Sequence, residues 1–190
     1  PCAYQRRFIR WAPRASGGGY KGEYNPIEVE TGKLEGVSLI DGTYFMGVPA
    51  GQPARDAKGQ PLFDHLSDTR NHFCLAKTAS GSWQPVLISM ASTQIKESKR
   101  WMSRIQGLEL RDGAGNRFNP PSFSHVYRLK PHKVENSKGS WWAFSAELIE
   151  QISDPEAYNK AKEFHKQVAT GAVEVQQPVQ QEAGSDEEKF

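Results

Sequence analysis

Residues 83–106 read WQPVLISMASTQIKESKRWMSRIQ, and the spacing of their apolar side chains changes within this segment. The first part, 83–91, is almost continuously apolar at its centre, which is typical of a strand buried on both faces. Ser92 or Thr93 can then cap a helix whose apolar residues recur near the helical period. Gly107 supplies a stop signal. The segment therefore predicts a buried strand that leads directly into an amphipathic helix.

The face of this helix that lies away from its apolar stripe is basic. Lys96, Arg100 and Arg104 stand four residues apart, and Lys99 lies beside them. Like charges at this spacing destabilise an isolated helix by about 0.2–0.5 kcal/mol per pair, so an anion along the face would be stabilising. The alternative interpretation is an ordinary solvated surface.

Other segments also alternate with the period of strands, and turn residues separate them. Asp41-Gly42 lies between apolar pairs and predicts a tight hairpin turn. Asp154-Pro155 predicts the start of a second helix, because Pro is favoured at the first helical position. The remaining predicted strands cover residues 2–11, 70–78, 123–130 and 141–149.

This order of elements predicts a mainly β fold. We expect an OB-like antiparallel barrel with a helix between the third and fourth core strands, followed by a C-terminal helix and a disordered tail. The expected boundaries are 1–152 for the barrel, 153–170 for the helix and 171–190 for the tail. The tail is polar and cannot build a core.

Charge is divided unevenly along the chain. The tail contains five carboxylates and one lysine, a net charge of −4, which leaves +6 on residues 1–170 of a total of +2. Such a basic body suggests an anionic partner, although many soluble domains carry a similar charge. The tail, in turn, resembles a polyanion in its charge.

Several classes of site and location have no support in the sequence. Cys2 and Cys74 lack the neighbours that a zinc site requires, so we expect no metal, no cofactor and reduced thiols. Phosphate-loop, nucleophile-elbow and metalloprotease motifs are missing, which argues against an enzyme. No apolar run reaches membrane-spanning length, and we expect a cytoplasmic protein.

Binding of single-stranded nucleic acid requires cations that follow the phosphates and exposed rings on which bases stack. The first strand and the closing hairpin offer both, and the basic helix adds cations. Trp141 should be exposed, because Trp142 and Phe144 alternate with it and are assigned to the core. The predicted nucleic-acid-binding residues are Tyr4, Arg6, Phe8, Arg10, Lys96, Lys99, Arg100, Arg104, Arg128, Lys130 and Trp141.

The chain ends in acidic residues closed by an aromatic ring, Asp186-Glu187-Glu188-Lys189-Phe190. In this tail, and in its basic body and strand–helix–strand order, it resembles the single-stranded DNA-binding proteins of tailed bacteriophages. That resemblance implies an OB fold and a tail that recruits replication or recombination proteins through Asp186, Glu187, Glu188 and Phe190. Residues 83–103 also look like a pattern in phage proteins of unassigned role.

These observations predict a non-enzymatic, sequence-tolerant binder of single-stranded DNA in phage replication or recombination, located in the host cytoplasm. We expect the acidic tail to gate the DNA-binding groove, and homo-oligomerisation stays open. One alternative is a protein-interaction module, an inhibitor or accessory subunit, that uses the same rings as contact anchors. Another is a metal-dependent nuclease that uses Asp64 and Asp68.

Overall fold

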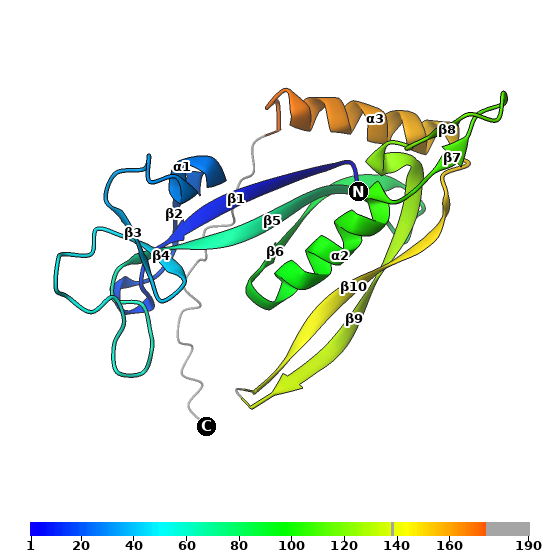
Figure 1. The fold of residues 1–190 in the computed structure, drawn as a ribbon. Coiled ribbons are helices and arrows are strands. Elements are labelled where there is room, and N and C mark those ends of the chain that lie inside the picture. The colour runs from blue at the N-terminus through cyan, green and yellow to red at the C-terminus, as the bar shows by residue number, and fades with distance from the viewer. Residues whose placement is uncertain (138, 174–190) are drawn as a thin grey trace. The chain divides into compact units, whose positions relative to one another are not determined.

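The computed structural model describes residues 1–137 and 139–173, and its elements are shown in Figure 1. The strands are β1 (Ala3–Trp11), β2 (Tyr20–Tyr24), β3 (Val37–Ile40), β4 (Thr43–Met46), β5 (Asp64–Lys77), β6 (Trp83–Ala91), β7 (Leu110–Arg111), β8 (Arg117–Phe118), β9 (His125–Asn136) and β10 (Gly139–Gln151). The helices are α1 (Pro26–Glu30), α2 (Ile95–Gln106) and α3 (Pro155–Ala169), with short 3-10 turns η1 (Arg14–Ser16), η2 (Ser92–Gln94) and η3 (Ser122–Ser124).

The described residues divide into two compact units. Residues 8–67 form one, which we call the small-sheet unit, and residues 1–7 with 68–173 form the other, the helix–hairpin unit. The sequence predicts one domain over residues 1–152 and a separate C-terminal helix. In the structure each unit has a hydrophobic core of its own, and α3 belongs to the helix–hairpin unit.

The small-sheet unit is organised around a core of Phe8, Val29 and Leu66. Strands β3 and β4 form the hairpin that the sequence predicts. Its two turn residues, Asp41 and Gly42, have φ values of 48° and 73°. Both are left-handed, as a type I′ turn requires, and Asp and Gly tolerate this conformation.

The helix–hairpin unit is built on the antiparallel pair of β5 and β6, which matches the predicted strands closely at β6. Helix α2 follows from η2 and buries the apolar stripe that the sequence predicts. Cys74 and Met90 of the strands pack with Trp101 and Ile105 of the helix. The base of the β9–β10 hairpin adds Tyr127, Leu129 and Ala146 to this core.

His72 lies at the centre of this packing and is fully buried. Its ring stacks on Trp101 with centroids 4.6 Å apart, and its Nε2 lies 2.8 Å from the Ser98 hydroxyl. Burial lowers the pKa of His72 from 6.5 to about 4, because the charged imidazolium would lose its hydration. The ring is therefore neutral at physiological pH.

Helix α3 begins at Asp154, whose side chain accepts a hydrogen bond from the Glu156 amide. It buries one apolar stripe, and its Tyr158 and His165 lie against the ring of Phe123 in η3. His165 Nδ1 also donates to the carbonyl of Cys2 at 2.7 Å. The predicted C-terminal helix is thus confirmed, and these contacts make it part of the helix–hairpin unit.

The prediction of a mainly β fold with antiparallel pairing is confirmed. Among the described strands, however, no pairing closes the six-stranded sheet into a barrel. Within the small-sheet unit, β5 pairs with β4 through residues 64–66, and within the helix–hairpin unit it pairs with β6 through residues 69–77. No helix in the described part of the chain is long and apolar enough to span a membrane.

Replacing Phe8 with alanine should lower the free energy of unfolding by about 3–5 kcal/mol, because the ring is 3% exposed and its loss leaves a cavity. Denaturant unfolding measures this change. Phe118, which is 45% exposed, is the matched control, and its alanine variant should change the free energy by less than about 1 kcal/mol. A Phe8 variant as stable as the control would contradict the burial of this ring.

Acidification should destabilise the fold through His72. Its pKa is lower in the folded chain than in the unfolded chain, so only the unfolded chain gains a proton as the pH falls from about 6.5 towards about 4. This linkage removes roughly 2 kcal/mol of stability between about pH 7 and about pH 5. A His72→Asn variant should lose stability less steeply over that range in denaturant unfolding, and equal slopes would contradict the assignment.

Candidate nucleic-acid interface

Helix α2 presents a continuous basic face to solvent. Ser98, Trp101 and Ile105 are buried on its inner side, which fixes the rotation of the helix about its axis. The opposite side carries the four cations that the sequence predicts, and all four are exposed: Lys96, Lys99, Arg100 and Arg104. The amphipathic pattern alone therefore predicts this part of the surface.

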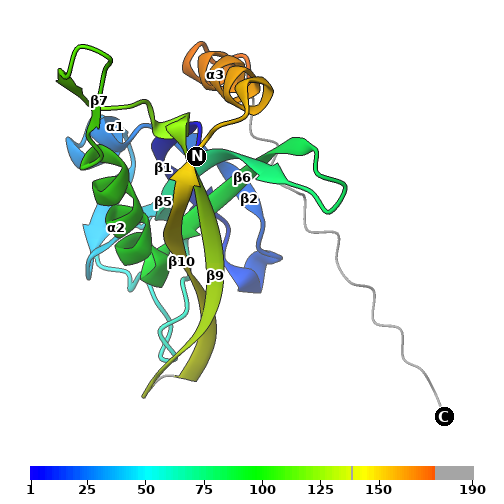
Figure 2. The same ribbon diagram turned by 90° about the vertical axis from the view of Figure 1, so that its right-hand side faces the viewer.

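The β9–β10 hairpin lies beside α2 (Figure 2). Arg128 pairs with Glu147 across the two strands, and Lys130 pairs with Ser145. Because side chains alternate along a strand, these residues share one face of the hairpin with Trp141. The hairpin thus places three predicted binding residues on a single face.

A groove of about 310 Å³ joins the helix to this hairpin face. We call it the basic groove, and its lining residues are Glu97, Arg100, Trp101, Arg104, Lys130, Ser145, Ala146 and Glu147. Arg104 Nη1 donates to the Ala146 carbonyl at 2.5 Å, which ties the helix to the edge of β10. Three predicted cations from two separate elements therefore meet in one hollow.

The carboxylate of Glu147 lies close to cations at the groove, and they lower its pKa. It lies 2.6 Å from the Lys130 ammonium. A hydrogen bond and the charge of Lys130 lower the pKa of Glu147, with smaller contributions from Arg128 and Arg104. Cations of the helix and the hairpin therefore converge on one anionic group, and a phosphate oxygen could take the place of that carboxylate.

A second carboxylate, that of Glu97, also lines the groove. Arg100 Nη1 lies 2.7 Å from Glu97 Oε1, one helical turn earlier. Exposed pairs of this kind contribute only about 0.2–1 kcal/mol each. The groove lining contains three cations, Arg100, Arg104 and Lys130, and two carboxylates, Glu97 and Glu147, so its formal net charge is positive.

The exposed rings of the hairpin differ from the prediction. Trp142 is 67% exposed and Phe144 is 43% exposed, so their assignment to the core is wrong. Their face packs into the core only at the base of the hairpin, through residues such as Leu129 and Ala146, and the strands continue beyond that contact. Trp141 is half-buried instead.

A signal for this exposure exists in the pairing of the strands. Trp142 lies opposite Lys133, and Phe144 lies opposite Pro131. A lysine and a proline are unusual cross-strand partners for two core rings. This signal depends on knowing which residues of β9 lie opposite Trp142 and Phe144. The sequence of β10 alone does not give that pairing, and the predicted first strand of the hairpin, 123–130, ends before Pro131 and Lys133.

The predicted binding residues of β1 lie elsewhere and are held in other contacts. Arg6 forms two hydrogen bonds with Asp68, at 2.9 and 3.0 Å, and Arg70 donates to the Tyr4 hydroxyl at 2.9 Å. Within the small-sheet unit, Arg10 donates to Asp64 at 2.6 Å. None of these residues lines the basic groove.

The structure also corrects the prediction for Phe8, which lies on the same strand. Its ring is 3% exposed and packs edge-on against Tyr44, with centroids 5.3 Å apart. A base cannot stack on a ring that is covered in this way. The expectation that Phe8 binds nucleic acid is therefore replaced by a role in the core.

The arginine contacts also bear on the nuclease alternative. Asp64 and Asp68, which that hypothesis requires as metal ligands, are ion-paired to arginines. Within residues 1–137 and 139–173, no three His, Cys, Asp or Glu side chains lie close enough together to hold a metal ion. The predicted partner-binding residues Asp186, Glu187, Glu188 and Phe190 lie outside the described residues.

Comparison with known proteins identifies a family. Residues 1–174 match the family described as Pam3 phage gp34-like protein, which covers both units of the described chain. No curated protein and no solved structure matches the sequence. The chain therefore belongs to the Pam3 phage gp34-like family of bacteriophage proteins.

Proposed function

We propose that this protein binds single-stranded DNA with little sequence preference, along the exposed face of α2 and the adjoining hairpin. The observation that carries the proposal is the position of Glu147, which is ion-paired with Lys130, lies across the strands from Arg128 and lines the same groove as Arg104. An anion already occupies the point where cations of two elements converge. A backbone phosphate would compete for the same donors and would add the charge of its neighbours along the strand.

The rings of the hairpin supply the second requirement. Trp142 and Phe144 are exposed on a two-stranded ribbon, with Lys133 opposite Trp142. Bases stack on exposed aromatic rings for about 1–3 kcal/mol each, and every base has such a face. By the alternation of side chains, Lys133 shares the face of these rings, whereas Arg128 and Lys130 lie on the other face of the ribbon. A duplex hides its base faces, so exposed rings favour a single strand.

The family adds a biological setting to this proposal. A role in phage replication or recombination, in the host cytoplasm, agrees with membership of a phage protein family. The OB-like barrel and the recruitment of partners through Asp186, Glu187, Glu188 and Phe190 stay predictions from the resemblance to phage single-stranded DNA-binding proteins. Binding through α2 and the hairpin does not depend on a closed barrel.

The exposed rings also favour a second candidate, a protein-interaction module. Trp is enriched at the centres of protein interfaces, and Trp142 is the most exposed large apolar residue among those described. This candidate uses the rings but has no need of the cations that converge on Glu147. The two functions therefore differ in how they respond to changes in the groove.

Replacing Glu147 with glutamine should strengthen binding of oligo-dT at low salt by about threefold to tenfold, because Lys130 and its neighbours lose a competing carboxylate. Fluorescence anisotropy of labelled oligo-dT measures the affinity. Glu109→Gln is the matched control, since it also removes one carboxylate from an exposed ion pair, with Arg117, but away from the groove.

The two variants have the same net charge, so a general electrostatic effect would strengthen binding equally in both. Equal gains, or no gain in either variant, would contradict a phosphate site at Glu147. Weaker binding by Glu147→Gln than by the control would also contradict a phosphate site there. In that case the Glu147 carboxylate would contact the DNA itself, instead of competing with its phosphates for Lys130.

Removing the exposed rings should weaken oligo-dT binding without unfolding the protein. Trp142→Ala and Phe144→Ala should each reduce affinity by roughly fivefold to a hundredfold, which corresponds to the loss of one stacked base. Phe118→Ala removes a ring of similar exposure, 45% against 43% for Phe144, from β8 and should leave affinity unchanged. If all three variants bind like the wild type, bases do not stack on the hairpin.

A further inference from the structure

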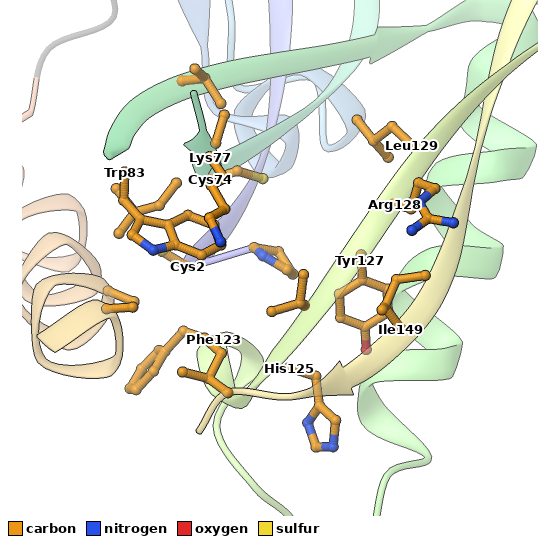
Figure 3. A pocket seen from close by; sticks show the side chains of 18 of the residues that line it. Cys2, Cys74, Lys77, Trp83, Phe123, His125, Tyr127, Arg128, Leu129 and Ile149 are labelled. Carbon is orange, nitrogen blue, oxygen red and sulfur yellow. The ribbon is translucent and has the colours of Figure 1, made fainter. Parts of the chain in front are cut away.

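The β9–β10 hairpin is anchored at its base and extends past helix α2. Tyr127 and Leu129 pack on the core at the base. Figure 3 shows these two residues and Ile149 along one wall of a hollow of about 560 Å³, which we call the apolar cavity. Trp142 and Phe144 line neither this cavity nor the basic groove. Figures 1 and 2 show the ribbon continuing past α2, and the exposure of both rings agrees with a position on this projecting part.

The two faces of the ribbon differ in their chemistry. Arg128 and Lys130 lie on the face that borders the basic groove, which we call the groove face. Trp142 and Phe144 lie on the opposite face, the ring face, and both are exposed there. One face therefore offers cations to phosphates, and the other offers flat apolar rings to bases.

Helix α2 and the turn before it cover one edge of the ribbon. The amide of Phe144 donates to Gln94 Oε1 at 3.4 Å, and Arg104 Nη1 donates to the Ala146 carbonyl at 2.5 Å. Side chains thus occupy main-chain groups on the outer edge of β10. A nucleic-acid strand that lies in the basic groove is blocked at this edge from passing round to the ring face.

We propose that the hairpin recognises a DNA fork, the junction at which a duplex opens into two single strands. One strand lies in the basic groove, with its phosphates at Arg100 and Lys130. Bases of the other strand stack on Trp142 and Phe144. A two-stranded ribbon is narrow enough to enter a major groove about 12 Å wide, so its cross-section suits the gap between two strands that part. The inference rests on the proposed binding of single-stranded DNA and extends it to a substrate that has two such strands.

A fork differs from the other DNA structures in how it uses the two faces. A single strand wrapped around the ribbon gains nothing when a second strand is added. A closed duplex hides its bases from the rings. A fork occupies both faces at once, and two linked contacts bind more tightly than either contact alone.

The test compares a duplex that carries two oligo-dT arms at one end with the same duplex carrying either arm alone or no arm. Fluorescence anisotropy measures each affinity. The wild type should bind the fork at least about tenfold more tightly than either one-armed duplex. A variant with both Trp142→Ala and Phe144→Ala should lose this gain, because the second arm has no rings on which to stack. Phe118→Ala, which removes an exposed ring from β8, is the control and should keep the gain.

Binding of free oligo-dT separates this inference from the proposed function. If the wild type binds oligo-dT but binds the fork no more tightly than a one-armed duplex, the fork inference is wrong and the proposed function stands. The same conclusion follows if the double variant keeps the gain. If the duplex without arms binds as tightly as the fork and oligo-dT does not bind, both are wrong. Failure of the wild type to bind any of these DNAs also overturns both.

Discussion

The position of Trp101 determines how the helix–hairpin unit is assembled. Its indole stacks on His72 of β5 and meets Tyr127 of β9 edge-on, with ring centroids 4.6 and 5.8 Å apart. One side chain of α2 thus contacts the sheet and the hairpin at once. Because this ring must face inward, the opposite face of the helix must face solvent, and its four cations with it. The basic groove and the apolar cavity are both consequences of that orientation.

The charges of the molecule serve two different purposes. The arginines of β1 are tied to carboxylates of β5, and these pairs occupy partly buried positions where an unpaired charge would be costly. The cations around Glu147 are exposed and share one carboxylate. Exposed ion pairs exchange partners at little cost, so the cations around Glu147 are suited to binding a mobile anion. The arginines of β1 are suited to holding strands together.

Much of the fold can be predicted from local patterns. The change of apolar spacing after residue 91 predicts α2, the Asp41-Gly42 turn predicts the β3–β4 hairpin, and Asp154-Pro155 predicts the start of α3. The cations of α2 are predicted for the same reason, since one helical period fixes which side chains face solvent. These features depend on residues that are close in sequence.

The errors arise where distant segments pair. Arg6 and Asp68 are 62 residues apart, and nothing near either residue indicates that they meet. The strand pattern of β10 shows that Trp142 and Trp141 face opposite ways, but only the extent of the packed core decides which of them is covered. The OB-like barrel, which stays a prediction, likewise depends on pairings between segments whose register the sequence does not specify.

The central claim is that exposed cations of α2 and the hairpin hold the phosphates of a single strand. The salt dependence of oligo-dT binding tests it most directly, with affinity measured from tryptophan quenching across a range of salt concentrations. The account predicts quenching and a logarithmic salt slope of about −2 or steeper, since each neutralised phosphate of a single strand contributes about −0.7. A protein that does not bind oligo-dT at low salt, or that binds it with a slope near zero, would contradict the account.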